Sequence, residues 1–192
     1  MKRLSVFLLT VLVALAASAW GRARHFKFNG AAIDGTMESF IGSKPFKRYQ
    51  VQERSAFSTL LTGPFAGRQC RVLVERLPDE DCVWGLTVML PSRDDWRGLL
   101  ADYREFTAQC AKQYGSPVAS SESFIGYNDP ENDRLRFWYV QEGICSYKSV
   151  YETDEGQVDV VIWHDSTNGC YVLLSFIDKS NSQRQFLADG GK

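Results

Sequence analysis

The sequence contains few of the residues on which most catalytic and metal sites depend. Only two histidines occur, His25 and His164, and His25 follows so soon after the predicted leader that we expect it to be mobile. No G-x-S-x-G motif is present, and the neighbours His164, Asp165 and Ser166 cannot form a hydrolase triad, which gathers residues from separate segments. No two cysteines form the C-x-x-C pair typical of zinc sites. We therefore expect no metal and no cofactor, and enzymatic activity is disfavoured.

Basic clusters and a second long apolar run are also absent. Charges of both signs are interspersed along the chain without a basic block or stripe, so nothing indicates a nucleic-acid partner or an anionic membrane surface. After the first twenty residues no stretch is long and apolar enough to span a bilayer. We therefore expect neither nucleic-acid binding nor a membrane-spanning segment in the mature chain.

The first residues have the pattern of a cleavable signal peptide. Lys2 and Arg3 precede an apolar run over 4–17, and Ala17-Ser18-Ala19 offers the small residues that a signal peptidase reads, which predicts cleavage before Trp20. A membrane anchor needs roughly 20 apolar residues, whereas this run has about 14. No cysteine follows for lipid attachment. We expect a periplasmic or extracellular protein with 20 basic and 23 acidic side chains once Lys2 and Arg3 are removed.

Five cysteines lie beyond the predicted leader: Cys70, Cys82, Cys110, Cys145 and Cys170. An oxidising compartment permits disulfides, but an odd count leaves at least one thiol unpaired. Their spacing does not choose among the pairings. We expect disulfides, with the connectivity left open.

The clearest predicted element is a helix over 94–114. Ser92 and Asp95 resemble a capping box, apolar residues recur at steps of three and four, and Gly115 with Pro117 ends the helix. A shorter helix is predicted over 37–41, with Thr36 as its cap. Because the long helix has one apolar face, it should pack against a core.

The remaining pattern predicts strands separated by turns rich in Gly, Pro, Asn and Asp. Those before the long helix cover 47–53, 56–62, 68–75 and 82–90, and those after it cover 120–127, 135–142, 145–152, 157–164 and 170–178. This order predicts an α+β fold with antiparallel meander sheets packed by helices.

The two sets of strands resemble each other. Gly67 is followed by a β-rich segment, a polar turn and Cys82, and Gly156 is followed by the same order up to Cys170. This similarity predicts an internal duplication of a helix-then-meander unit, although two ordinary hairpins can also look alike. The chain then divides into a signal peptide (1–19), an N-terminal segment (20–33), a first unit (34–90), a second unit (91–178) and a C-terminal tail (179–192).

Two resemblances follow from this layout. Its element order resembles that of β-lactamase inhibitor protein-like domains and of small outer-membrane-assembly lipoproteins, in which helices pack on one face of an antiparallel sheet. The segments FNGAAIDG (28–35), FAG (65–67), YGSP (114–117) and CYVLL (170–174) look like small exported proteins of anaerobic gut bacteria. Neither resemblance implies a mechanism, because function is not inherited from a fold.

One arrangement of strands suggests a thiol–imidazole site. If the turns over 153–156 and 165–169 close consecutive hairpins, Cys145, His164 and Cys170 lie roughly opposite one another on adjacent strands. An imidazole can lower the pKa of a nucleophilic thiol. Buried or disulfide-linked cysteines are the alternative, and a register shift of one residue abolishes the alignment.

A second candidate site is aromatic. In a strand over 135–142, Arg134, Arg136 and Trp138 share one face, which Trp163 can share from a nearby strand. If helices cover the other face, these side chains form an open surface of the type enriched in protein interfaces.

The sequence thus favours an exported, non-catalytic binding protein for an unknown protein or cell-envelope component. The alternatives are a thiol enzyme built on His164 with Cys145 or Cys170, and a carbohydrate-binding accessory protein that stacks Trp138 and Trp163 on sugar rings.

Overall fold

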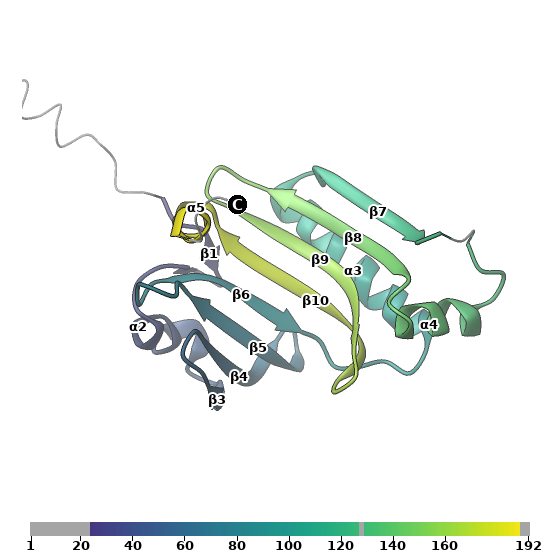
Figure 1. Ribbon diagram of the computed structural model, residues 1–192, viewed down its shortest axis with the longest axis horizontal. Helices are drawn as coiled ribbons and strands as arrows, with labels where there is room; N and C mark the ends of the chain where they lie inside the picture. The colour runs from purple at the N-terminus through teal and green to yellow at the C-terminus, as the bar shows by residue number, and fades with distance from the viewer. Residues whose placement is uncertain (1–23, 127–128, 189–192) are drawn as a thin grey trace, which may run out of the picture.

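The computed structural model describes residues 24–126 and 129–188, so the predicted signal peptide and its cleavage position lie outside the described residues. In these ranges no helix is long and apolar enough to cross a membrane. Figure 1 shows an α+β fold built on one large antiparallel sheet.

The large sheet has eight strands in the order β3-β4-β5-β6-β10-β9-β8-β7, and every neighbouring pair is antiparallel. The strands are β3 (Gln50–Arg54), β4 (Ser58–Phe65), β5 (Arg68–Arg76), β6 (Val83–Met89), β7 (Ala119–Phe124), β8 (Cys145–Glu152), β9 (Gly156–Asp165) and β10 (Gly169–Asp178). A separate hairpin pairs β1 (Lys27–Phe28) with β2 (Ala31–Ala32). The helices are α2 (Met37–Ile41), α3 (Trp96–Tyr114), α4 (Asp133–Gln141) and α5 (Lys179–Ala188), with a 3₁₀ turn at Lys44–Phe46.

Both halves of the chain follow the same order of elements. Helix α2 precedes the meander β3–β6, and α3 precedes β7–β10 with α4 inserted after β7. The two meanders join where β6 pairs with β10, and there the hydroxyls of Thr87 and Ser175 face each other 3.1 Å apart. A helix followed by a meander thus occurs in each half, while the internal duplication and the two-unit division stay predictions.

The predicted helices form for the expected physical reasons, with one change of cap. Helix α3 covers 96–114, but Asp95 rather than Ser92 caps it, accepting a hydrogen bond of 2.9 Å from the amide of Gly98. Gly115 follows with a φ of 89°, a left-handed value that glycine tolerates best. Thr36 caps α2 by accepting from the amide of Ser39 at 3.2 Å.

The predicted strand over 135–142 is wrong, because this segment is the helix α4. Asn132 accepts a hydrogen bond of 2.9 Å from the amide of Leu135 and caps the helix. Asp133 in the first turn pairs with Arg136 at 3.1 Å, one turn further on. Aromatic and β-branched residues suggested a strand, but the cap and the helical spacing of Phe137 and Val140 decide the local structure.

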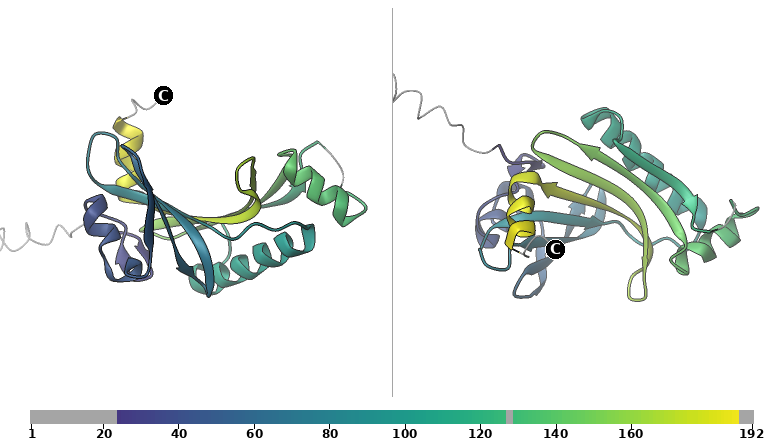
Figure 2. Two further views of the ribbon diagram at one scale, coloured as in Figure 1. Left: turned by 90° about the horizontal axis from the view of Figure 1, so that it is seen from below. Right: turned by 45° about the horizontal axis from the view of Figure 1, so that its top comes forward.

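Helices cover one face of the sheet, which we call the helical face. Helix α3 lies across β8, β9 and β10, while α2 and the β1–β2 hairpin pack under the first meander (Figure 2). A single core joins both halves, since the buried side chains form one cluster. Helix α5 begins inside the predicted tail, contacts one end of the sheet, and is capped by Asp178, which accepts from the amide of Asn181 at 2.9 Å.

Candidate functional site

The side chains of the central strands alternate between a covered and an accessible face. Along β4 and β5, side chains toward the helical face are buried, and those between them are mostly half-buried. The same alternation runs through β6 and most of β10. We call the second side the open face. In Figure 2, left, α5 and α4 stand near its two ends, and α3 lies on the opposite side of the sheet.

The strand register aligns side chains on the open face into rows that cross the sheet. One row contains, in order, Arg71, Met89, Leu173, Val161 and Lys148, from β5 to β8. Its three central members are apolar and half-buried, and its two ends are cationic. Lys148 also pairs with Asp159 at 2.6 Å.

The next row is aromatic, because Trp163 and Tyr171 lie directly opposite each other. Trp163 is 51% exposed, which is unusual for so large an apolar side chain, whereas Tyr171 is buried. The guanidinium of Arg71 lies 6.0 Å from the centre of the Tyr171 ring, and the Tyr171 hydroxyl donates to Asp165 at 2.6 Å. Arg71 and Asp165 therefore hold in place Tyr171, the residue opposite Trp163.

Asp165 organises the turn between β9 and β10. Its Oδ1 accepts hydrogen bonds from the amides of Thr167 and Asn168 at 2.9 and 2.7 Å. Burial alone would raise the pKa of Asp165, but the hydrogen bonds from Asn168 and Tyr171 outweigh it and lower that pKa to about 2. This carboxylate therefore accepts hydrogen bonds that stabilise the turn and fix the Tyr171 hydroxyl.

The sequence placed four residues on one binding face, and the structure separates them. Trp163 is on the open face, while Arg134, Arg136 and Trp138 are on α4, so their predicted position on a strand beside Trp163 is wrong. Trp138 is 46% exposed, and its ring contacts Tyr139 with centroids 5.3 Å apart. The guanidinium of Arg136 pairs with Asp129 and Asp133.

The predicted thiol–imidazole group forms only in part. Cys170 lies directly opposite His164, and Cys145 starts the neighbouring strand β8. Burial raises the pKa of Cys145 to about 12 and that of Cys170 to about 11, so both thiols are protonated at neutral pH. Among the described residues, no hydrogen bond joins His164 to either sulfur. The geometry does not activate a nucleophile.

All five cysteines are free thiols, so the expected disulfides are not found. Cys145 is half-buried and the other four are buried. Burial also raises the pKa of Cys70 and Cys110 to about 11. These thiols behave as small core residues.

Comparison of the chain with protein-family models, with curated proteins and with solved structures found no match. The resemblances that the sequence suggests therefore stay predictions.

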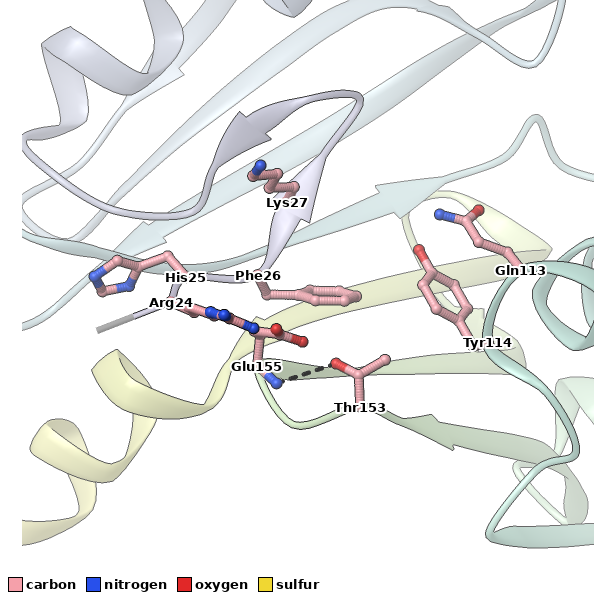
Figure 3. Close-up of a pocket in the computed structure, with 8 residues that line it drawn as sticks. All are labelled: Arg24, His25, Phe26, Lys27, Gln113, Tyr114, Thr153 and Glu155. Carbon is pink, nitrogen blue, oxygen red and sulfur yellow. Dashed lines mark hydrogen bonds between the residues drawn. The ribbon is translucent and has the colours of Figure 1, made fainter. Parts of the chain in front are cut away.

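The structure also shows a cleft that the sequence did not predict (Figure 3). It has a volume of about 640 Å³ and lies between the start of the described chain, the end of α3 and the β8–β9 turn. The rings of Phe26 and Tyr114 both line it and lie against each other, with centroids 5.8 Å apart. Phe26 packs against Gly156, where an added Cβ would lie 2.3 Å from the ring. The alternation of Phe26 and Phe28 with polar neighbours was the only sequence signal for this packing.

A buried carboxylate holds the segment that forms this cleft. Asp178 is fully buried and accepts hydrogen bonds from the Phe26 amide at 2.7 Å and from His25 Nδ1 at 3.2 Å. The other ring nitrogen of His25 lies 3.5 Å from Asp34. The expectation that His25 is mobile is therefore wrong, because distant residues fix it against the end of β10.

Proposed function

We propose that this protein is an exported, non-catalytic binding protein that recognises a protein or cell-envelope component through the open face of its sheet. The observation that carries the proposal is the central apolar row of Met89, Leu173 and Val161, which lies beside exposed Trp163 and between Arg71 and Lys148. Trp, Met and Arg are enriched at the centres of protein interfaces.

The size of the open face suits a protein partner. The six inner strands, from β4 to β8 in the sheet order, have at least seven residues each and span about 24 Å at about 4.8 Å spacing, and eight residues along a strand span about 26 Å. The resulting area of roughly 600 Å² is of the same order as the area of about 800 Å² that each partner contributes to a typical stable interface. A partner need not cover the whole sheet to bind specifically.

The alternative functions have less support. The raised pKa values of Cys145 and Cys170 disfavour a thiol enzyme, because catalysis needs the thiolate. A carbohydrate-binding site of the expected kind needs two tryptophans side by side to stack on sugar rings. It has less support because Trp138 is on a helix rather than beside Trp163 on the sheet. The proposed resemblance to β-lactamase inhibitor protein-like domains is compatible with a binding role but does not identify the partner.

Site-specific photo-cross-linking in the exporting cells tests this proposal. A photoreactive phenylalanine analogue replaces Met89 or Trp163 on the open face, and Arg104, which is exposed on α3, serves as the control position. We expect a discrete adduct of the same mass from both open-face positions and none from Arg104. Absence of adducts at the open face, or equal adducts at Arg104, would contradict the proposal.

A further inference from the structure

The two edges of the large sheet differ in how they are protected. An edge strand presents unpaired N–H and C=O groups with which another chain can pair, and charged side chains and bulges normally prevent such pairing. Strand β3, at one edge, has both features, because its register shifts between Val51 and Glu53 and because Arg54 pairs with Glu38. This edge is therefore poorly suited to pairing with a further strand.

Strand β7, at the opposite edge, has few of these features. It pairs with β8 in an unbroken register from Ala119 to Phe124, contains neither lysine nor proline, and carries Glu122 as its one charged residue. Val118 directly before the strand and Ile125 directly after it are each 62% exposed, more than any other large apolar side chain in the part of the chain that the structure describes. Figure 1 shows β7 at the outer margin of the sheet, farthest from β3. This edge is open to a further strand.

The pairing of β7 with β8 determines which backbone groups of β7 point outward. The Ile125 amide donates to the Ile144 carbonyl oxygen at 2.7 Å, so the N–H and C=O of residue 125 are on the side of β8. Because this side alternates along an antiparallel strand, the backbone groups of Ser121 also point toward β8, and those of Ser120 and Glu122 point toward the free edge. These outward groups are the donors and acceptors available to a further strand.

From these observations we infer that β7 pairs with β7 of a second copy of this chain across a twofold axis, which joins two eight-stranded sheets into one. An axis perpendicular to the sheet makes the two strands antiparallel. Their outward groups meet only if the axis passes beside one residue, and Ser121 and Glu122 are the two choices that overlap nearly the whole strand. An axis at Glu122 places two carboxylates directly opposite each other, which is unfavourable. The axis therefore passes beside Ser121.

In this register the strand is complementary to itself. Ser120 of each copy lies opposite Glu122 of the other, and Ala119 lies opposite Ser123, so no like charges meet and no bulky side chain blocks the approach. The open faces of both copies point to the same side of the joined sheet. The inference does not depend on the proposed function, because it concerns the edge of the sheet, and either can fail without the other.

Cysteine cross-linking of the exported protein tests the pairing and its register. Ser121 lies opposite its own copy at a position without hydrogen bonds to that copy, where Cα atoms are about 4.5 Å apart and a disulfide can form. We expect Ser121→Cys to give a covalent dimer under mild oxidation. The control Ser123→Cys is on the same strand and face, but its two copies are about 14 Å apart, too far for a disulfide. Equal dimer yields from both variants, or no dimer from Ser121→Cys, would overturn the inference.

Sedimentation velocity measures the dimer without a cross-link. We expect a reversible monomer–dimer equilibrium at concentrations up to about 200 µM, which reach the weak affinities of small interfaces. Glu122→Pro removes an outward N–H from each copy, and thus two of the four main-chain hydrogen bonds that the opposed Ser120 and Glu122 exchange, so it should weaken dimerisation about tenfold or more. The matched control Glu122→Ala keeps this N–H and should dimerise like the parent protein.

Two results of this measurement would overturn the inference. One is equal dimerisation of the Glu122→Pro and Glu122→Ala variants, because the outward N–H would then play no part. The other is a parent protein that stays monomeric throughout the concentration range, which would leave the edge of β7 to an extended segment of a different protein.

Discussion

The side chain of Asp102 holds together three segments from both halves of the chain. It lies on α3, is 3% exposed, and accepts from Arg68 Nη1 at 2.8 Å. Arg93, in the linker between β6 and α3, donates to the same carboxylate from Nε at 2.8 Å and from Nη2 at 3.0 Å. Arg68 belongs to β5, so this carboxylate ties the long helix to the first meander.

We predict that Asp102→Asn destabilises the protein by about 2 kcal/mol. Removing one partner of a fully buried ion pair costs about 3–5 kcal/mol. The cost is smaller here because the side chains of Arg68 and Arg93 are 23% and 40% exposed, which lets water solvate the guanidinium groups left unpaired. The matched control is Glu105→Gln, since Glu105 also pairs with Arg68 but is 43% exposed, and its loss should cost under about 1 kcal/mol.

Urea unfolding followed by circular dichroism measures both variants. With a slope of about 2 kcal/mol per molar urea, Asp102→Asn should lower the midpoint by about 1 M without changing the slope. Glu105→Gln should lower it by less than about half of that. If the two variants shift the midpoint equally, the buried carboxylate does not hold the segments together and the reasoning is refuted.

Three further predictions concern packing, thiol chemistry and the open face. Gly156→Ala should destabilise the protein by about 2–3 kcal/mol in thermal unfolding, because its Cβ would lie 2.3 Å from the Phe26 ring and 2.5 Å from the Ile177 carbonyl oxygen. Burial raises the pKa of Cys145 from 9.0 to about 12, so its stabilising contribution is complete below about pH 9 and is lost as the pH rises toward 12. The midpoint in urea should therefore fall between pH 8 and pH 10.5, and a thiol reagent at pH 7 should label the native protein slowly and the unfolded protein fully. Trp163→Ser should lower the free energy of unfolding by no more than about 2 kcal/mol, because about half of the side chain is already exposed in the folded protein, and a larger loss would mean that it belongs to the core.

Much of the fold could be predicted from the sequence because its signals are local. The apolar spacing and the terminal Gly115 of α3, and the turn residues between strands, act over a few positions, so eight of the nine predicted strands are confirmed. The prediction of a strand over 135–142 was wrong because alternation over so few residues fits either a strand or a helix. The Asn132 side chain caps the first turn and thereby favours the helix.

The candidate sites depend on contacts between distant parts of the chain, which local patterns do not contain. The row on the open face exists because β6 pairs with β10, which places Met89 beside Leu173. The position of His25 depends on Asp178, at the far end of the sequence. Trp163 was identified because it lies on a strand of clear alternation, whereas the cleft requires the β1–β2 hairpin to fold under the sheet.

Hydroxyl-radical footprinting of the exported protein tests most directly whether one face of the sheet is open for a partner. Met89 and Trp163 on the open face should be oxidised readily, while Trp96, which is 3% exposed on the helical face, should be protected until the protein unfolds. If Met89 and Trp163 are as protected as Trp96, the open face is covered in the free protein and the proposed binding surface does not exist.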